Sequence, residues 1–286
     1  MSEPAPHRLD LDAYCARIGY AGPRQPTLAT LRGLQLSHVQ AIPFENLDVL
    51  LGRGIDLALP AIERKLVHAR RGGYCFEQNA LLLAVLLQLG FAATPLSARV
   101  RIGRARDVTP PRTHLCIRVD LDGEPWLCDV GVGGLSPTAP LRLDTAAPQP
   151  TPHETRRLVR EGDWDGERRD PTARIFHQVL LAGEWQDVYE FTLEPMAEID
   201  REVANWFTAA HPQSHFRNRL MAARATADGR LTVLNREFSR RGVDGKAEVR
   251  ALRDQDELLA VLAEHFALHL PVGTRFDGPA FTWATA

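Results

Sequence analysis

The sequence predicts an α+β protein, because three stretches of the chain carry three different apolar patterns. Residues 1–90 place apolar side chains at helical spacing, and residues 91–204 alternate apolar and polar side chains as strands do. Residues 205–286 combine two hairpin patterns with a final helix. At 286 residues, two or three domains with a shared interior are expected. We therefore expect domains over these three ranges.

Three helices are predicted in the first part. One begins at Leu28, with Thr27 as its N-cap. The second covers residues 61–67, where Ile62 and Leu66 share a face. The third covers residues 78–89 and is closed by Gly90.

A β-hairpin is predicted around the Asp-Gly pair at residues 122–123. Asp-Gly between two alternating runs is the strongest short-range signal for a hairpin. A strand at 95–102 precedes it, and short strands follow at 158–159, 175–181 and 187–193. These strands predict a β-barrel or a β-sandwich.

The last part of the chain contains two more hairpin turns and one helix. The turns are predicted at residues 227–229 and 243–245. The helix begins at Asp254, where Glu257 completes a capping box, and it stops before Pro271.

Composition argues against several classes of function. The chain has 34 basic and 36 acidic residues and no long basic run, so neither nucleic acid nor an anionic membrane is indicated as a partner. The N-terminus lacks the order of a signal peptide, and the longest apolar run, residues 80–87, is too short to span a bilayer. Four cysteines do not suggest a disulfide scaffold in a chain this long, so we expect a cytoplasmic protein with reduced thiols.

Cys75 follows two glycines and precedes a strongly apolar helix pattern. Gly72 and Gly73 permit unusual backbone angles and keep side chains away from an approaching group. If the helix starts near Tyr74, the Cys75 sulfur lies at the positive end of the helix dipole, which favours a thiolate. Taken alone, a small packing residue is the commoner explanation of such a cysteine.

The predicted hairpin supplies a base and an orienting carboxylate for that cysteine. With residues 122 and 123 at the centre of the turn, paired positions sum to 245, so Cys116 faces Asp129 and His114 faces Gly131. His114 and Asp129 then lie on one face as diagonal neighbours, within reach of a hydrogen bond. A one-residue shift of the turn would place them on opposite faces. Together with Cys75 they suggest a Cys-His-Asp triad.

Two other uses of these residues are weaker. A zinc site of Cys75, His114, Cys116 and Cys128 lacks metal-binding spacing, so no metal is expected. The segment Gly131-Val-Gly-Gly134 is glycine-rich, but no Lys-Ser/Thr pair follows it, so it is a poor phosphate loop. It still leaves room for a bulky ligand to approach the triad.

Most of the chain resembles the arylamine N-acetyltransferases, with a bacterial pattern. The resemblance rests on short blocks in a fixed order, of which the block around Cys75 is the most specific. They are Ile42-Pro-Phe-Glu-Asn-Leu47, Arg70-Arg-Gly-Gly-Tyr-Cys-Phe-Glu-Gln-Asn79, Ala98-Arg-Val100, Thr113-His114, Asp129-Val-Gly-Val-Gly-Gly134, Asn205-Trp-Phe-Thr208 and His211-Pro-Gln-Ser-His-Phe216.

The resemblance implies an N-terminal helical bundle, a central β-barrel and a C-terminal α/β lid around a cysteine-protease-like Cys-His-Asp core. It maps the family's triad onto Cys75, His114 and Asp129. It also implies acetyl-CoA as the donor and an aromatic amine or hydrazine as the acceptor, with an acetyl-cysteine intermediate in a ping-pong reaction. The protein would be a monomer or a homodimer.

The resemblance further implies which residues line the pocket. The acceptor cleft would contain Phe44, Val100, Thr113, Val132 and Phe216, and CoA would lie near Gly131, Gly133 and Gly134. Relatives often carry phenylalanine where this chain has Val132, so we expect a wider pocket here. The alternative for the aromatic and β-branched residues is a purely structural role, packing in the core.

Three rival functions use the same residues. A macrolactam-forming amide synthase belongs to the same superfamily, and a cysteine hydrolase or transglutaminase-like enzyme would use the same triad without CoA. A binding protein with a structural Cys75 would be unaffected in ligand binding by Cys75→Ala.

Overall fold

The computed structural model describes residues 7–161, 172–281 and 283. Its helices are α1 (Leu11–Ile18), α2 (Leu28–Ala41), α3 (Leu47–Leu50), α4 (Leu59–Glu63), the π-helical turn η1 (Arg64–His68), α5 (Cys75–Gln88), α6 (Glu198–Ala210), the 3₁₀ turn η2 (His215–Arg217), α7 (Gln255–Phe266) and the 3₁₀ turn η3 (Pro279–Phe281). Its strands are β1 (Phe44–Glu45), β2 (Ala92–Val100), β3 (His114–Leu121), β4 (Glu124–Cys128), β5 (Leu141–Arg142), β6 (Arg156–Arg160), β7 (Ile175–Leu181), β8 (Glu184–Pro195), β9 (Met221–Ala225), β10 (Gly229–Leu234), β11 (Glu237–Gly242) and β12 (Ala247–Ala251). The predicted α+β class is confirmed.

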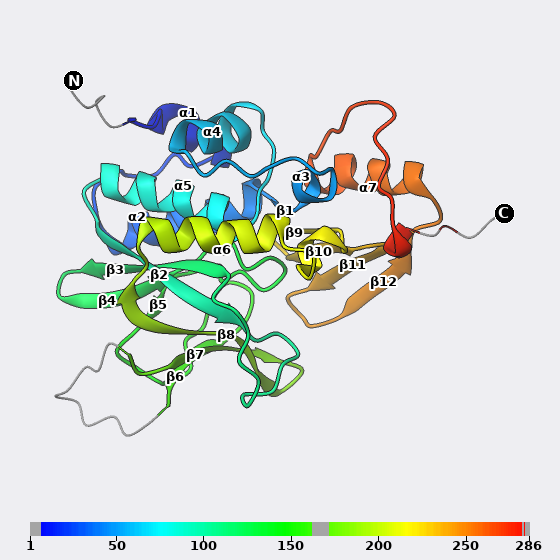
Figure 1. The fold of residues 1–286 in the computed structure, drawn as a ribbon. Coiled ribbons are helices and arrows are strands. Elements are labelled where there is room, and N and C mark those ends of the chain that lie inside the picture. Colours follow the sequence, from blue (N-terminus) through cyan, green and yellow to red (C-terminus); the bar gives the residue numbers. More distant parts are fainter. Residues whose placement is uncertain (1–6, 162–171, 282, 284–286) are drawn as a thin grey trace.

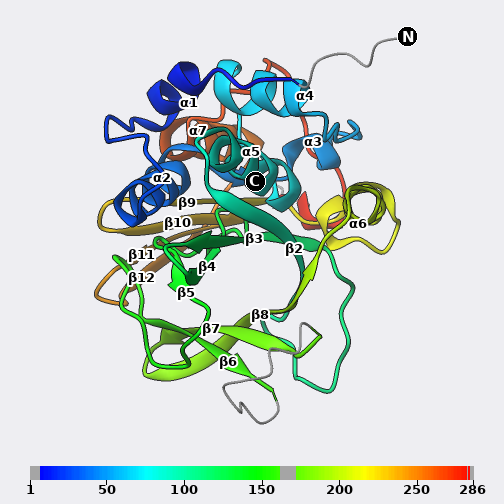
Figure 2. The same ribbon diagram turned by 90° about the vertical axis from the view of Figure 1, so that its left-hand side faces the viewer.

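The middle of the chain folds into a strongly curled antiparallel sheet. Its strand order is β5-β4-β3-β2-β8-β7-β6, and the two edge strands contact each other. Figure 2 shows this sheet curling around an interior. Apolar side chains from its strands fill that interior, among them Leu96, Leu127 and Val188. Of the two β architectures predicted, the barrel is the one observed.

The β3–β4 hairpin has the predicted register. Ile117 pairs with Cys128 and Leu121 pairs with Glu124, so paired positions sum to 245. The two turn residues have φ of 52° at Asp122 and 79° at Gly123, the left-handed pair that a tight hairpin of this twist requires.

Helix α5 lies between the other N-terminal helices and the outer face of the barrel (Figure 2). It packs on β2 and β3, where Leu115, Ile117 and Val119 point away from the barrel interior and toward the helices. The helix begins three residues before the predicted start at residue 78. Its apolar run starts only at Ala80, because the first turn carries polar side chains whose partners come from elsewhere in the chain.

Other N-terminal predictions agree in place with small differences in form. The Thr27 hydroxyl caps α2 by accepting a hydrogen bond from the Thr30 N–H at 3.3 Å. The predicted helix at 61–67 is divided into α4 and the π-helical turn η1.

The C-terminal part forms a second antiparallel sheet in the order β1-β9-β10-β11-β12. Helix α7 packs against it through a separate apolar core that includes Leu258, Leu262 and Phe266 (Figure 1). At its N-terminus the Asp254 carboxylate accepts a hydrogen bond from the Glu257 N–H at 2.8 Å. Strand β1 comes from the range assigned to the first domain, so the parts share this sheet, and the predicted boundaries remain a prediction.

Helix α6, which was not predicted, crosses the front of the molecule in Figure 1 and lies at its right-hand edge in Figure 2. Among the described residues, no helix combines the length and apolar character needed to cross a membrane.

Candidate active site

Cys75 is the first residue of α5 and is 3% exposed. Its Sγ lies 3.4 Å from the Thr113 carbonyl oxygen, to which the thiol donates. The residue before it, Tyr74, is the N-cap, and its N–H donates to the Glu77 carboxylate at 3.1 Å. The condition for a dipole effect on the cysteine, a helix start near Tyr74, is therefore met.

The glycine pair before Cys75 serves close packing rather than unusual backbone angles. Neither glycine is in the left-handed region, which is occupied instead by Arg70 at φ 52°. A Cβ on Gly72 would lie 2.2 Å from the Pro43 oxygen, and one on Gly73 would lie 2.7 Å from Oε2 of Glu77. The expectation that these two glycines adopt unusual backbone angles was wrong. Side chains are excluded at both positions, but by the protein's own packing.

His114 and Asp129 are brought together beside Cys75. His114 begins β3, and Asp129 is the first residue after β4. The His114 Nε2 donates to Oδ2 of Asp129 at 2.8 Å, and both side chains are almost fully buried. The diagonal arrangement expected from the hairpin register thus produces the hydrogen bond.

Electrostatics favour a charged pair at this position. Burial would lower the pKa of His114, but the charge and hydrogen bond of Asp129 outweigh it, and with a smaller contribution from Cys75 they raise the pKa to about 10. Burial opposes ionisation of Asp129, yet His114 and the donors around the carboxylate hold its pKa below the ordinary value. The imidazole therefore carries a proton at neutral pH.

Asn79, which the sequence reasoning assigned no role, holds the carboxylate of Asp129. Its Nδ2 donates to Oδ1 of Asp129 at 2.8 Å and to the Leu115 carbonyl at 2.6 Å, and its Oδ1 accepts from the Val130 N–H at 3.0 Å. Asn79 lies four residues after Cys75, on the same face of α5. That spacing is a signal from which it might have been identified.

Tyr189 is a second neighbour that the sequence did not indicate. Its ring centroid lies 4.9 Å from that of His114 inside the barrel. It reaches the site from β8, where it pairs with Val100 of β2. Only the long-range pairing of these two strands brings it there.

The predicted pocket residues divide into two groups. Phe44 and Phe216 lie together, with ring centroids 6.2 Å apart, and Tyr74 contacts Phe216 edge-on at 5.7 Å. Thr113 contacts the Cys75 sulfur through its carbonyl. Val132, in contrast, is part of the apolar barrel core, and Val100 is half-buried at the end of β2.

The glycine-rich segment after Asp129 packs closely against its neighbours. A Cβ on Gly131 would lie 2.7 Å from Cα of Cys75 and 2.8 Å from Nδ2 of Asn79. Gly133 has φ of 82° and faces the Phe44 ring, while a Cβ on Gly134 would lie 2.9 Å from Thr232 in β10. The segment therefore joins the nucleophile's helix, the barrel and the second sheet.

Within the described residues, no group of three or more histidine, cysteine, aspartate or glutamate side chains is placed to hold a metal ion. The zinc alternative gains no support from this arrangement. A cysteine at a helix start, beside a buried histidine held by an aspartate, is the arrangement of enzymes that transfer acyl groups through a thiol.

Comparison with known proteins identifies which of these enzymes are related. A family profile described as N-acetyltransferase matches residues 27–275. The arylamine N-acetyltransferase of Escherichia coli K12 is 42% identical over 259 residues, covering 90% of this chain and 88% of that protein. Among solved structures, the arylamine N-acetyltransferase of Nocardia farcinica has a TM-score of 0.85 at 39% identity and covers 95% of each chain. That of Mycobacterium marinum in complex with CoA has a TM-score of 0.84 at 39% identity, covering 90% of this chain and 92% of that one.

The chain therefore belongs to the arylamine N-acetyltransferase family.

Proposed function

We propose that the protein transfers the acetyl group of acetyl-CoA to the nitrogen of an arylamine or arylhydrazine, through an acetyl-Cys75 intermediate. The observation that carries the proposal is the 2.8 Å hydrogen bond between His114 and Asp129 beside a cysteine at a helix start. The family, and the CoA complex of a relative at 39% identity, support the donor.

In the first half-reaction, the Cys75 thiolate attacks the carbonyl carbon of the acetyl thioester. The bond between that carbon and the CoA sulfur breaks, His114 protonates the leaving thiolate, and acetyl-Cys75 remains. Asp129 fixes the Nε2–H tautomer, so that Nδ1 is the nitrogen that exchanges the proton. Asn79 and the Gly131 N–H hold the same carboxylate, the latter at 2.8 Å.

In the second half-reaction, the amine attacks the acetyl-Cys75 carbonyl. An arylamine is neutral near pH 7 because its lone pair is delocalised into the ring, so it attacks without losing a proton first. His114 takes the proton from nitrogen as the carbon–sulfur bond breaks, and the Cys75 thiolate is regenerated beside the protonated imidazole.

The aromatic groups beside Cys75 suit an aromatic acceptor. Phe44, Phe216 and Tyr74 form a set of ring contacts at the start of α5. We assign Phe44, Thr113 and Phe216 to the acceptor side and Gly131, Gly133 and Gly134 to the CoA side. Val100 and Val132 contribute from the barrel.

A cytoplasmic location fits the chemistry, since the reaction requires a reduced thiol. All four cysteines are free and buried. A monomer or a homodimer would both serve the mechanism, because every group used lies in one chain.

Intact-mass spectrometry after incubation with acetyl-CoA tests the proposal. An adduct of about 42 Da, an acetyl group replacing hydrogen, is expected on Cys75 and should be discharged by an arylamine. Cys75→Ala should remove the adduct, and the matched variant Cys15→Ala should retain it. Acetylation of arylamine without any adduct would contradict the ping-pong mechanism, and spontaneous rapid discharge to acetate would indicate a hydrolase instead.

A further inference from the structure

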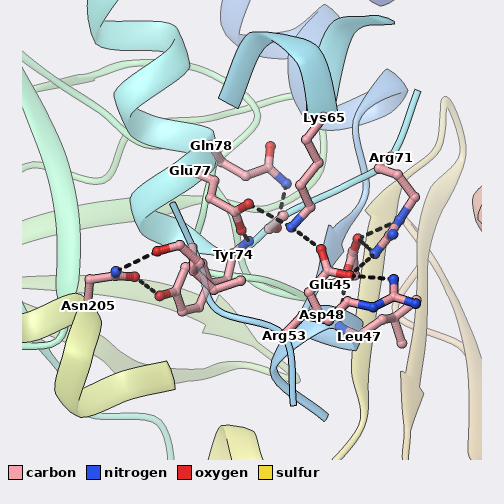
Figure 3. A network of polar contacts seen from close by, with 12 residues as sticks. Glu45, Leu47, Asp48, Arg53, Lys65, Arg71, Tyr74, Glu77, Gln78 and Asn205 are labelled. Carbon is pink, nitrogen blue, oxygen red and sulfur yellow. Dashed lines mark hydrogen bonds and ion pairs between the residues drawn. The ribbon is translucent and has the colours of Figure 1, made fainter. Parts of the chain in front are cut away.

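A network of charged side chains, all but one of them buried or half-buried, lies beside the first turn of α5, on the side away from His114 and Asp129. Figure 3 shows these side chains reaching one another from η1, α5, α3, β1 and the connecting segments. We call this set the Lys65–Glu77 cluster; it contains Glu45, Asp48, Arg53, Lys65, Arg71 and Glu77. It contains three acids and three bases, so every charge has an opposite partner.

Glu77 links this cluster to the backbone that presents Cys75. Its Oε2 accepts the Tyr74 N–H at 3.1 Å, and its Oε1 lies 2.6 Å from Nζ of Lys65. The side chain is 3% exposed, and its Oε2 occupies the space that a Cβ on residue 73 would need, at 2.7 Å from that position. The carboxylate therefore fixes the residue directly before Cys75.

Lys65 holds that carboxylate in place from the opposite side. Its Nζ bridges Glu77 at 2.6 Å and Asp48 at 2.8 Å. Asp48 in turn contacts Arg71, whose guanidinium pairs with the fully buried Glu45 at 2.7 Å. Without Lys65, Glu77 would be a buried carboxylate with no cation in contact, which is strongly unfavourable.

We propose that the Lys65–Glu77 ion pair is a positioning device for Cys75, and that a proton on Glu77 releases it. The pair acts on the reactive sulfur through the Tyr74 N–H and the first turn of α5. The inference rests on the proposed role of Cys75 as nucleophile and adds a second ionisation that controls it.

Burial brings the ionisation of the Glu77 carboxylate close to neutral pH. Burial raises the pKa of Glu77 to about 7, Lys65 opposes the rise, and the nearby Glu45 adds to it. Lys65 itself stays charged, because Glu77, Glu45 and Asp48 outweigh its burial and raise its pKa. Two other charged groups, Asp48 and Arg71, lie near Glu77, and they are paired with each other. As pH falls through about 7, Glu77 takes up a proton and the ion pair is lost, whereas His114 remains protonated on both sides of that pH.

The rate of Cys75 alkylation by iodoacetamide, measured from pH 5.5 to 9 (roughly two pH units on either side of the Glu77 transition), tests this without using acetyl-CoA or an arylamine. Wild-type protein should show a fall in rate as pH drops through about 7. Glu77→Gln, which cannot ionise, should lack this step: it should match the wild type at the acid end and react about fivefold more slowly at the alkaline end. Fivefold is the change expected if the loss of the Lys65–Glu77 ion pair weakens the placement of Cys75 by about as much as the loss of one ordinary hydrogen bond.

Lys65→Met gives an independent signature. Removing the cation that opposes the rise should move the step to higher pH, whereas Lys65→Arg should restore it to near its wild-type position. If Glu77→Gln does not fold, these two variants still decide the question.

Glu63→Gln is the matched control. Glu63 is also a buried carboxylate that accepts an N-cap N–H, from Asp10 of α1 at 2.7 Å, but its hydrogen bonds and ion pairs are with His7, Asp10 and His68, none of which belongs to α5. Its substitution should leave the pH profile of alkylation unchanged. The proposal is overturned if Glu77→Gln keeps the wild-type profile, or if Glu63→Gln alters it equally.

Failure of this proposal is distinguishable from failure of the proposed function. If the alkylation profile shows a step that depends on Glu77 but Cys75 never carries an acetyl adduct, the positioning role is supported and the acetyl-transfer chemistry is contradicted. An acetyl adduct on Cys75 with no Glu77-dependent step would do the reverse.

Discussion

Cys75 and the His114–Asp129 pair reach the same site from two regions that are held in different ways. The histidine and aspartate lie at the open end of one hairpin, and its register sets them side by side. The start of α5 is held by groups 12 or more residues away, such as the Lys65 side chain at 2.6 Å from Glu77 and the backbone carbonyl of Pro43 at 2.9 Å from the Gln78 side chain. The base is thus placed by local geometry and the nucleophile by long-range polar contacts and close glycine packing.

If the hairpin region works as a unit, Asp129→Asn should have the largest effect. Asparagine can still fill the space, but it lacks the charge that, after the effect of burial, raises the pKa of His114. We expect acetyl transfer to fall on the order of a thousandfold or more. Steady-state kinetics and an NMR titration of His114 measure the two consequences.

Asp120→Asn is the control for that prediction. Asp120 lies on the same hairpin but pairs with Arg118 at the surface, with its side chain 43% exposed. Activity should be unchanged. A similar loss in both variants would mean that general disruption of the hairpin, rather than the charge at position 129, causes it.

The buried His114–Asp129 pair should also make folding stability depend on pH. The pKa of His114 is raised above the unfolded value of 6.5 to about 10, so its contribution is complete below 6.5 and is lost as pH rises through about 10. At about 1.4 kcal/mol per pKa unit, the loss is on the order of a few kcal/mol. Urea unfolding across this range should show the decline in wild-type protein and a flatter profile in His114→Gln. The exposed His68 offers a control, since His68→Gln should keep the wild-type decline.

The contact between the two regions is tested by Gly131→Ala. A methyl group at this position would lie 2.7 Å from Cα of Cys75, where neither side can yield without a backbone shift. We expect a loss of stability of about 1–3 kcal/mol. A displacement of Cys75 relative to His114 should lower kcat roughly 10- to 100-fold.

Gly54→Ala provides the comparison for that variant, because an added Cβ there meets nothing within 4 Å and the residue is exposed. Thermal unfolding and kcat should both stay near wild type. Full activity in Gly131→Ala would show that the two regions tolerate separation.

The same contrast explains which features could be predicted from the sequence. The hairpin and its register follow from Asp-Gly and the alternating pattern, so the His114–Asp129 contact was within reach of sequence reasoning. The start of α5 was placed three residues late, and the reason for the glycine pair was partly misjudged, because both depend on β1 and Glu77 packing against that segment. Tyr189 comes from a strand 75 residues away from His114 in the chain, and no local pattern indicates such a pairing.

The smallest effect is expected where the nucleophile region meets α6. The Tyr74 hydroxyl donates to Oδ1 of Asn205, while the Tyr74 ring packs between Phe76 and Phe216. Tyr74→Phe keeps the ring and removes only this hydrogen bond, so we expect a loss of about 1 kcal/mol in the free energy of unfolding and little change in kcat. Tyr20→Phe, which removes a hydroxyl bonded to the Pro23 carbonyl at 2.7 Å at the surface, is the control for loss of a tyrosine hydroxyl. A tenfold or greater fall in kcat for Tyr74→Phe with folding intact would mean that α6 also positions Cys75. The nucleophile would then depend on contacts from all three parts of the chain, and the base on one hairpin.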